Sequence, residues 1–194
     1  MTWEEFLLFA KDILVKSNEL GDNWQLVGKD ENYSQYLMKQ EKHVCENENS
    51  HLEECDSNDF NDKSEATFNS VIVYNFEYHV TYNISYMVPV LSFNASKPDG
   101  TILTLDSAWK ILLQNGVTDS SFHSILTQMD HPVLQIPFLT LHPCRTQELL
   151  GKFQKSYNLL LTFISVIGPY IGLRCDLRYG QTNDLTMKFD FAHK

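Results

Sequence analysis

The stretch IVYNFEYHVTYNI at residues 72–84 decides the fold of this chain. Its even positions carry Ile, Tyr, Phe, Tyr, Val, Tyr and Ile, and its odd positions from residue 75 onward carry Asn, Glu, His, Thr and Asn. Successive side chains of a strand point to opposite faces, so the alternation predicts a long strand with one buried face. Strands usually span ~5–6 residues, so we expect a bend or a break into two strands.

A helix is predicted upstream of this strand, over residues 3–20. Apolar side chains recur there at helical spacing, which is typical of an amphipathic helix. Thr2 and Glu5 form a capping-box pair at its start, and Gly21 provides a stop at its end. We expect the apolar stripe to pack on the domain core, although an exposed stripe would bind a partner protein.

Two regions lie between this helix and the long strand. Residues 24–27 and 33–38 have the apolar character of paired strands around a turn, which predicts a short hairpin. Residues 45–67 are acidic, rich in Asn and Ser, and poor in apolar side chains. Such a composition buries too little apolar surface to fold, so we interpret this segment as a flexible acidic loop within one domain.

Shorter strands are predicted after the long one. Pro89 lacks a backbone N–H, so it should end the regular pairing or mark a sheet edge. Residues 90–93 resume strand character, and Lys-Pro-Asp-Gly at residues 97–100 forms a turn in which the glycine accepts a positive φ. Residues 101–105 then form the next strand.

Helices and one further strand complete the expected order. Asp106 or Ser107 caps a short helix that ends at Asn115. Residues 136–141 form an apolar strand, and residues 152–167 form a second long helix. A helix followed by antiparallel strands and then by helices predicts an α+β fold, an antiparallel sheet flanked by helices, and not alternating βαβ units.

The size and charge of the chain restrict its class. Its 194 residues favour a single domain over residues 1–194, and its formal net charge of −10 argues against nucleic-acid binding, because phosphate backbones would be repelled. Four cysteines are too few for a disulfide scaffold.

No membrane insertion or secretion is expected. The apolar run at residues 159–173 is shorter than the ~20 residues that cross a bilayer, so no transmembrane segment is predicted. Glu4 and Glu5 precede the first apolar stretch, and a secretory signal would carry basic residues there. We therefore expect a cytoplasmic protein with free thiols.

Cys144 is the strongest candidate nucleophile in the sequence. Pro143 takes the chain out of strand pairing, so the thiol should lie just past a strand end, where functional groups are common. Arg145 places a positive charge beside the sulfur, and a nearby cation favours the reactive thiolate. By contrast, Cys175 is expected to be a structural core residue, the usual position of a lone cysteine in apolar surroundings.

Three stretches resemble a known family. HPVLQIPFLTLHPCRTQELL at residues 131–150 is similar to the active-site region of the autophagy E2-like conjugating enzymes, with LHPC as the most specific part. EYHVTYNISYMVPVLSF at residues 77–93 and DGTILTLDSAW at residues 99–109 resemble the paired strands and the following helix. Two families share the pattern, one acting on a lipid and one on a protein. The short acidic loop resembles the second, the autophagy-related protein ten family.

This resemblance implies a ubiquitin-conjugating-enzyme-like (E2-like) fold and an acyl-transfer reaction. Cys144 would accept a ubiquitin-like protein from an E1-like activating enzyme as a thioester and pass it to a substrate lysine. The implied partners are the E1-like enzyme, the ubiquitin-like autophagy protein twelve and the substrate autophagy protein five. No cofactor is implied, and recruitment to the autophagosome assembly site is expected.

One departure from ordinary ubiquitin-conjugating enzymes concerns the oxyanion of the tetrahedral intermediate. Those enzymes carry a His-Pro-Asn motif upstream of the cysteine, whereas this chain has His-Pro-Val at residues 131–133. Asn115, Thr140 and His142 are the alternatives for the supporting group. Asn115 is a weak candidate, because the end of a helix is the usual role of such a residue, and His142 would act as an acid/base or orient the loop.

Substrate docking is expected on the long strand. One face of that strand should be buried in the core, which leaves its polar face, or an edge beside it, for the substrate protein. Strand addition is a common mode of peptide and protein recognition. The candidate substrate-binding residues are Tyr74, Glu77 and Tyr78.

Other functions fit parts of the sequence. A cysteine protease would need a histidine base beside the thiol, and none of the seven histidines stands in a protease pattern. His43, Cys45, His51 and Cys55 are zinc-ligand types, but their spacing matches no established finger and falls mostly in the acidic loop. The lipid-conjugating sibling family and a non-catalytic scaffold of the same fold are the remaining alternatives.

Overall fold

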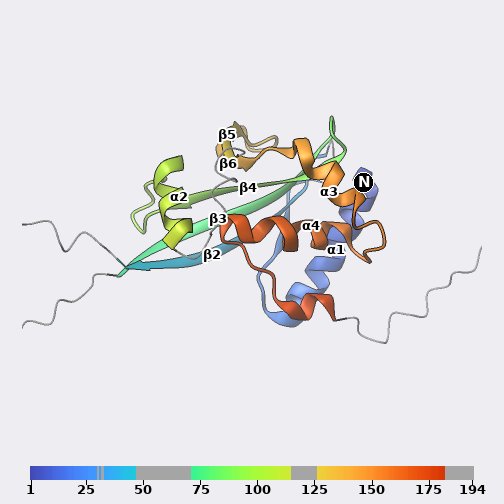
Figure 1. The fold of residues 1–194 in the computed structure, drawn as a ribbon, viewed down its shortest axis with the longest axis horizontal. Helices are drawn as coiled ribbons and strands as arrows, with labels where there is room; N and C mark the ends of the chain where they lie inside the picture. Colours follow the sequence, from blue (N-terminus) through green and yellow to red (C-terminus); the bar gives the residue numbers. More distant parts are fainter. Residues whose placement is uncertain (30, 32, 47–70, 115–125, 182–194) are drawn as a thin grey trace, which may run out of the picture.

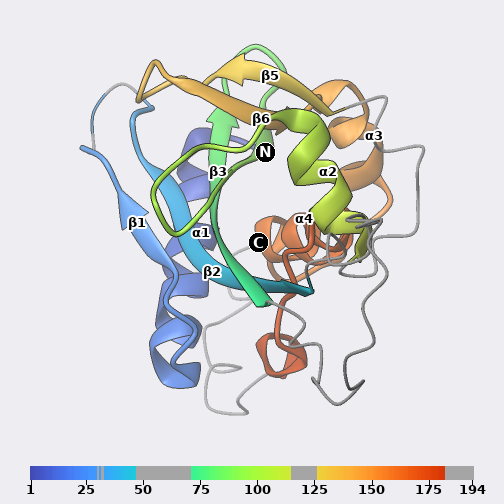
Figure 2. The ribbon, with the colours of Figure 1, turned by 90° about the vertical axis from the view of Figure 1, so that its left-hand side faces the viewer.

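The computed structural model describes residues 1–29, 31, 33–46, 71–114 and 126–181. Within these residues the strands form one antiparallel sheet of six strands in the order β1-β2-β3-β4-β6-β5 (Figure 1). The sheet curves, with β5 and β6 along one border and β1 at the other, and the helices lie inside the curve (Figure 2). The predicted α+β class is confirmed, and the arrangement is consistent with an E2-like fold.

The elements follow one another in the order expected for this class. The strands are β1 (Gln25–Val27), β2 (Tyr36–Glu46), β3 (Val71–Asn83), β4 (Val88–Ser96), β5 (Leu126–Asp130) and β6 (Pro137–Leu141). The helices are α1 (Trp3–Leu20), α2 (Leu105–Gln114), α3 (Thr146–Gly151) and α4 (Leu159–Ile167), with 3-10 turns η3 (Pro143–Arg145), η4 (Gly168–Ile171) and η5 (Leu177–Gly180). No helix in these ranges has the length and apolar content needed to cross a membrane.

Helix α1 matches its prediction. Thr2 Oγ1 accepts a hydrogen bond from Glu5 N at 3.2 Å, and Glu5 Oε2 accepts one from Thr2 N at 2.8 Å, which is the predicted capping box. Gly21 ends the helix with a φ of 69°. Phe6 and Ile13 are buried, so the apolar stripe packs on the core as expected.

Strand β3 follows the predicted long strand without interruption. It pairs with β2 on one side and β4 on the other. The expected break into two strands is wrong, because ladder bonds to these two neighbours hold the strand along its length, whereas the alternative of a bend agrees with the curved course of β3 in Figure 2. The even positions Phe76, Tyr78 and Val80 face the core as predicted. The odd position His79 is buried as well, because a residue of the turn between β5 and β6 packs on it.

The predicted hairpin before β3 is confirmed. β1 pairs antiparallel with the start of β2, from Gln25 opposite Met38 to Val27 opposite Tyr36. β2 extends to residue 46, beyond its predicted end, because β3 pairs with it throughout that extension. The acidic loop therefore does not start at residue 45, and residues 47–67 lie outside the described part of the chain.

Pro89 lies inside β4 and does not end it. It is paired opposite Tyr82 of β3, so the expected end of regular pairing is wrong. β6 pairs with β4 only at Ser92 and Phe93, so no described strand flanks Pro89 on its other side. The missing N–H of proline therefore falls where β4 has one strand neighbour, which agrees with the alternative that Pro89 marks an edge.

The turn predicted at residues 97–100 is confirmed, but the strand after it is not. Gly100 has a φ of 86° and closes the turn with a 3.0 Å hydrogen bond from its N–H to the carbonyl at the start. Beyond the turn, Ile102 forms a single bridge with Ser96. The strand expected at residues 101–105 is therefore wrong, because helix α2 begins before further pairs can form.

Helix α2 is capped slightly earlier than predicted. Thr104 Oγ1 accepts a hydrogen bond from Ser107 N at 3.3 Å, so Thr104 caps the helix, and not Asp106 or Ser107. An oxygen side chain that receives the N–H three residues on is the usual N-cap arrangement. Asn115, the predicted end of this helix, lies outside the described residues.

The helix predicted over residues 152–167 is wrong in its first half. α3 ends at Gly151, and α4 starts only after Asn158, whose Oδ1 accepts from Leu161 N at 2.8 Å. Asn158 Nδ2 also donates to Phe9 O of α1 at 3.0 Å. Asn158 therefore starts a new helix and anchors it beside α1, where the two helices lie against each other (Figure 1).

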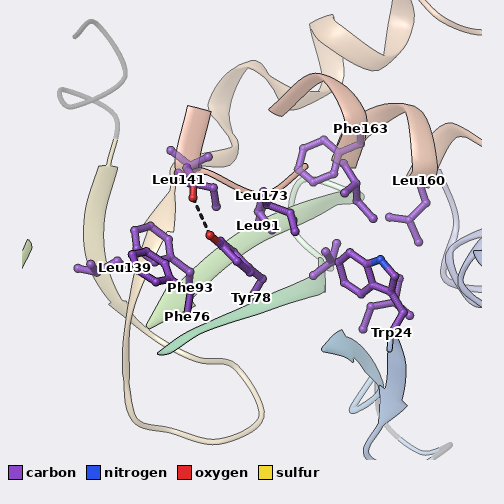
Figure 3. Close-up of a cluster of buried hydrophobic side chains, with 14 of the residues drawn as sticks. Trp24, Phe76, Tyr78, Leu91, Phe93, Leu139, Leu141, Leu160, Phe163 and Leu173 are labelled. Carbon is purple, nitrogen blue, oxygen red and sulfur yellow. Dashed lines mark hydrogen bonds between the residues drawn. The ribbon is translucent and has the colours of Figure 1, made fainter. Parts of the chain in front are cut away.

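One apolar core lies between the sheet and the helices (Figure 3). Tyr78 is fully buried in it, and its hydroxyl donates to Ile171 O at 3.0 Å. The rings of Phe76 and Phe93, on neighbouring strands, stack with centroids 5.8 Å apart. Burial of a large apolar side chain stabilises a fold by roughly 1.5–3 kcal/mol, so this cluster holds β3 and β4 under the helices.

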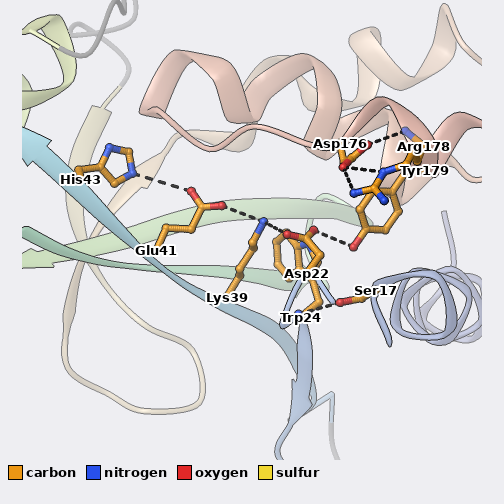
Figure 4. A network of polar contacts seen from close by, with 9 residues as sticks. All are labelled: Ser17, Asp22, Trp24, Lys39, Glu41, His43, Asp176, Arg178 and Tyr179. Atoms are coloured by element: carbon orange, nitrogen blue, oxygen red, sulfur yellow. Dashed lines mark hydrogen bonds and ion pairs between the residues drawn. The ribbon is translucent and has the colours of Figure 1, made fainter. Parts of the chain in front are cut away.

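A polar network on the same side of the sheet holds the C-terminal segment against β2 (Figure 4). Lys39 is buried and contacts Asp22 at 2.6 Å and Glu41 at 2.8 Å. Tyr179 in η5 donates from its hydroxyl to Asp22 at 2.8 Å. Burial alone would lower the pKa of Lys39, but the two carboxylates outweigh it and raise that pKa above its usual value. Lys39 is therefore charged and paired in the folded protein.

Candidate active site

Cys144 lies in a short exposed turn that follows the end of β6. The strand ends at Leu141, and Cys144 is the middle residue of the 3-10 turn η3. Its thiol is exposed, as its position after a strand end predicts. A thiol exposed in this way is accessible to a macromolecular partner as far as the described residues show.

The other thiol with a described environment, Cys175, is partly buried. Burial raises the pKa of that thiol despite a hydrogen bond with Ser165. A raised thiol pKa lowers the fraction of thiolate, the reactive form. Cys175 therefore has the structural character that the sequence predicts.

His142 caps the turn that carries Cys144. Its Nδ1 accepts a hydrogen bond from the backbone N–H of Cys144 at 3.2 Å, and Pro143 occupies the first position of the turn. Because Nδ1 is the acceptor, the neutral ring carries its proton on Nε2. The contact is with the backbone of Cys144 and not with its sulfur, which matches the loop-orienting alternative for His142.

Arg145 and Thr140 flank this turn in different settings. Arg145 is exposed at the end of η3, directly after Cys144. Thr140 is buried in β6 opposite Ser92 of β4, and its hydroxyl donates to Phe138 O at 3.4 Å. A hydroxyl bonded within the sheet is poorly placed to stabilise an external oxyanion, so the contacts of Thr140 do not support its predicted role.

Tyr86 is a neighbour of this turn that the sequence did not single out as a site residue. Its ring lies 6.4 Å from the ring of His142 at an interplanar angle of 73°, an edge-to-face contact. It belongs to the turn between β3 and β4, where Ile84 and Met87 are also exposed. In the sequence, the signal for such a residue is a group of apolar side chains within a turn between two strands, where exposure is expected.

His131 occupies the place of the histidine in the His-Pro-Asn motif of ordinary ubiquitin-conjugating enzymes. Its Nδ1 accepts from the backbone N–H groups of Val133 and Leu134 at 3.2 and 3.1 Å, which closes the turn between β5 and β6. Its ring is 2% exposed. Val133, which stands where those enzymes have Asn, offers no side-chain donor. This first His-Pro turn is therefore structural.

A buried chain of polar groups fixes His131 from the other side. His131 Nε2 lies 3.1 Å from His79 Nδ1, and His79 Nε2 lies 3.0 Å from Glu77 Oε1, a close polar contact without the alignment of a hydrogen bond. Because His131 Nδ1 accepts two N–H groups, its proton is on Nε2 and is donated to His79. Burial, together with the neighbouring His79, lowers the pKa of His131 to about 4, so this ring is neutral at pH 7.

Comparison with known proteins assigns this site to a family. Residues 5–177 match the family model described as "autophagocytosis associated protein, active-site domain". This range contains both His-Pro turns and Cys144. The chain belongs to this family. The resemblance seen in the sequence is thereby confirmed at the level of the family, and Cys144 lies inside an active-site domain.

Three relatives of this autophagocytosis-associated family member carry the name ubiquitin-like-conjugating enzyme ATG10. The one from Homo sapiens is 39% identical over 123 residues, which cover 56% of this chain and 54% of the relative. The one from Dictyostelium discoideum is 29% identical over 128 residues, 57% of this chain and 56% of the relative. The one from Arabidopsis thaliana is 32% identical over 114 residues, which cover 53% of this chain and 51% of the relative. The chain thus spans about half the length of the curated relatives it matches.

The three predicted substrate-binding residues of this family member lie on β3 but on different faces. Tyr78 is fully buried, so its side chain has no surface for a partner, and Tyr74 packs partly buried against the same core. Glu77 points to the opposite face, where it is 35% exposed and accepts from Gln40 at 2.6 Å. Glu77 lines an open groove of about 860 Å³ there, and its role in substrate binding stays a prediction.

The part of the chain that the structure describes holds no cluster of metal-ligand side chains. His43, one of the four residues in the zinc alternative, lies in β2 with its Nε2 3.1 Å from the hydroxyl of Tyr78. Cys45 is in the same strand, and His51 and Cys55 lie outside the described residues. His43 therefore has a structural partner, and nothing among the described residues favours a metal site.

Proposed function

We propose that the protein is an E2-like conjugating enzyme that carries a ubiquitin-like protein as a thioester on Cys144. The observation that supports this most directly is an exposed Cys144 thiol in a capped turn, within a chain that matches an active-site domain over most of its length. The relatives' shared name, ubiquitin-like-conjugating enzyme, supports the same class of reaction.

In the first step, the Cys144 thiolate attacks the thioester carbonyl of a ubiquitin-like protein held by an E1-like activating enzyme. A new carbon–sulfur bond forms, and the thiolate of the E1-like enzyme leaves. One carbon–sulfur bond forms as another breaks, so the step needs no oxidant or reductant. The proposed donor is the ubiquitin-like autophagy protein twelve.

In the second step, a lysine amine of autophagy protein five attacks the Cys144 thioester. The uncharged amine forms the isopeptide bond and releases its proton to water, and the carbon–sulfur bond breaks so that the Cys144 thiolate leaves. The oxyanion formed on the way needs a hydrogen-bond donor. His142 is the favoured candidate among the described residues, since its Nδ1 accepts from Cys144 N and its Nε2 keeps the proton. Asn115 lies outside the described residues and stays a prediction.

The contacts of Cys144 favour acyl carriage over cysteine proteolysis. A cysteine protease pairs its thiol with an imidazole that removes the proton. Among the described residues, no imidazole nitrogen makes a hydrogen bond to the Cys144 sulfur, and the nearest contact, from His142, is with the backbone. A carrier whose thiolate is regenerated at every transfer has less need of a dedicated base at the sulfur.

A charging assay tests the proposal. The protein is incubated with the E1-like enzyme, ATP and the ubiquitin-like protein, and the products are separated on reducing and non-reducing gels. Wild type should form an adduct that reductant cleaves, and Cys144→Ser should form an oxyester that resists reductant. Cys175→Ser is the matched control and should charge like wild type. With a charged E1-like enzyme present, the absence of a cleavable wild-type adduct rejects the proposal.

The acceptor distinguishes this function from that of the lipid-conjugating sibling family. The charged protein is offered autophagy protein five and, separately, vesicles that contain phosphatidylethanolamine. Transfer to protein five, blocked by Cys144→Ser, is the expected result. Transfer to the lipid without transfer to the protein would assign the chain to the sibling reaction.

A further inference from the structure

A small polar cavity lies on the face of the sheet opposite the apolar core. Its volume is about 240 Å³, and three hydroxyl side chains of neighbouring strands line it: Thr81 of β3, Ser92 of β4 and Thr140 of β6. Pockets for drug-sized ligands usually measure ~300–1,000 Å³. This cavity therefore suits a single side chain better than a cofactor.

The pairing of the strands places the three hydroxyls on one face. Ser92 is directly opposite both Thr140 of β6 and His79 of β3, and directly opposite residues share a face. Thr81 is two residues beyond His79, so it points to the same side. Opposite Cβ atoms lie ~4.5–5.5 Å apart and diagonal neighbours ~7–8 Å apart, so one charged group can reach more than one of these hydroxyls.

Two of the hydroxyls are buried without a partner. Thr81 is 5% exposed and Ser92 is 3% exposed, and neither hydroxyl makes a hydrogen bond to another residue in the described part of the chain. The Thr140 hydroxyl donates its proton to Phe138 O, which leaves its oxygen free to accept a hydrogen bond. Buried polar groups in proteins nearly always have a partner, so the two free hydroxyls indicate a ligand.

The rest of the lining selects the charge of that ligand. Asp130 lines the cavity, is exposed and has no ion-pair partner among the described residues. No lysine or arginine is among the described residues that line the cavity, so an anion would be repelled there. Met129 and Pro132 add an apolar wall. The lining therefore offers acceptors for one positively charged group and apolar surface for the stem that carries it.

A lysine side chain matches this arrangement. Its ammonium has three N–H donors and no acceptor, and the hydroxyls and the carboxylate of the cavity are acceptors at separate positions. Its methylene stem is apolar and would lie along Met129 and Pro132. An arginine is a poorer match, because its planar guanidinium pairs best with the two oxygens of one carboxylate.

We propose that this cavity, the hydroxyl pocket of Thr81, Ser92, Thr140 and Asp130, binds a lysine side chain of the acceptor protein, a lysine other than the one that is acylated. Strand β6 contributes Thr140 to the pocket and then runs directly into the turn that carries Cys144. The ubiquitin-like protein is bound covalently at that stage, whereas the acceptor is held by noncovalent contacts alone. The inference rests on the proposed function, because the second transfer step defines the acceptor.

Binding to the uncharged protein is the first test. Nα-acetyl-lysine amide is titrated while NMR follows the backbone N–H signals of Thr81 and Ser92. Nα-acetyl-norleucine amide, which lacks the ammonium, is the comparison ligand. The lysine compound should shift both signals with a Kd of ~1–10 mM, the weak affinity expected for one side chain, and the norleucine compound should not. No shift with the lysine compound, or equal shifts with both compounds, would overturn the proposal.

Substitutions in the pocket locate this binding. Ser92→Ala removes one acceptor and should weaken it about 2- to 10-fold, the range of one hydrogen bond. Ser96→Ala is the matched control, because Ser96 is on the same strand and face but does not line the hydroxyl pocket, and binding should be unchanged. Thr81→Val keeps the shape of its side chain and should weaken binding as Ser92→Ala does. Wild-type affinity in both pocket variants would overturn the proposal.

Folding of the variants is checked by urea denaturation. The Ser92 hydroxyl has no partner in the described part of the free protein, so Ser92→Ala should be as resistant to urea as wild type. A loss of lysine binding without a loss of stability separates ligand binding from a structural role of the hydroxyl. If Ser92→Ala unfolds more easily than wild type, the hydroxyl stabilises the fold, and Thr81→Val alone decides the binding role.

The transfer step distinguishes a lysine of the acceptor protein from a free amine. With autophagy protein five as acceptor, Ser92→Ala should raise KM about 2- to 10-fold and leave kcat and charging by the E1-like enzyme unchanged. An unchanged KM, with n-butylamine shifting the signals of Thr81 and Ser92, would assign the pocket to small free amines and reject the acceptor role. Wild type that fails to charge rejects the proposed function, yet the titration of uncharged protein still decides whether the pocket binds a lysine side chain.

Discussion

Two His-Pro turns of this protein have the same local construction and different roles. In each turn the Nδ1 of the histidine accepts a backbone N–H two residues on, from Val133 to His131 and from Cys144 to His142, both at 3.2 Å. The first turn joins β5 to β6, and the second follows β6 directly. Strand β6 is therefore bounded at both ends by a histidine-capped turn.

The surroundings of the two histidines differ. His131 is enclosed by the rings of Tyr36 and Phe138 and bonded to His79, whereas His142 is exposed and contacts Tyr86 at the surface. A buried cap stabilises the sheet, and an exposed cap presents the thiol beside it. The same two-residue sequence thus serves the fold in one place and the proposed chemistry in the other.

The largest difference between the two turns should appear in stability. His131→Ala empties a buried ring site, removes the acceptor of the Val133 and Leu134 N–H groups and leaves Nδ1 of the buried His79 without its partner, so it should lower the free energy of unfolding by ~2–4 kcal/mol. Urea denaturation of the uncharged protein measures this loss. His131→Asn keeps a hydrogen-bond acceptor for the turn, so its free energy of unfolding should fall by less than that of His131→Ala. A His131→Ala protein as stable as wild type would contradict the structural role of the first turn.

A pH effect on stability should come from the buried turn as well. The pKa of His131 is lowered to about 4 in the folded protein, whereas a histidine in an unfolded chain titrates near ~6.5. On acidification the unfolded state binds the proton first. The free energy of unfolding should therefore be retained above about pH 6.5 and fall by up to ~3 kcal/mol as the pH approaches 4.

Urea denaturation at stepped pH measures this effect, with His131→Asn as the comparison. Burial also lowers the pKa of His43, which adds to the loss in the same range of pH in both proteins. The part due to His131 is the difference between wild type and variant, and the variant should show the smaller loss. Equal losses in the two proteins would show that His131 does not contribute.

The smallest effect on stability is expected in the exposed turn. His142→Ala removes one surface cap, which should cost ~1 kcal/mol or less. His142→Asn restores an acceptor at the same place and should recover most of that loss in urea denaturation. A loss in His142→Ala as large as that in His131→Ala would mean that burial does not separate the two turns.

Regular elements with a clear periodic pattern were predictable from the sequence. Alternation gave β3, and helical spacing with a capping box gave α1, because both patterns reflect the direction of side chains along a regular backbone. The start of β4 and the start of α4 were not predictable. Pro89 stays in its strand because β4 has only one strand neighbour there, and Asn158 starts α4 because its amide also bonds to α1.

The sequence by itself determined that Cys144 follows a strand, since Pro143 removes a backbone donor and bends the chain at that point. It also determined which histidines precede a proline. The tertiary structure alone decided that His131 is buried against His79 and that His142 meets Tyr86. Those contacts join residues far apart in the chain, and no local pattern encodes them. The physical reason is that burial and ring packing depend on which strands become neighbours, and the pairing of the whole sheet sets that choice.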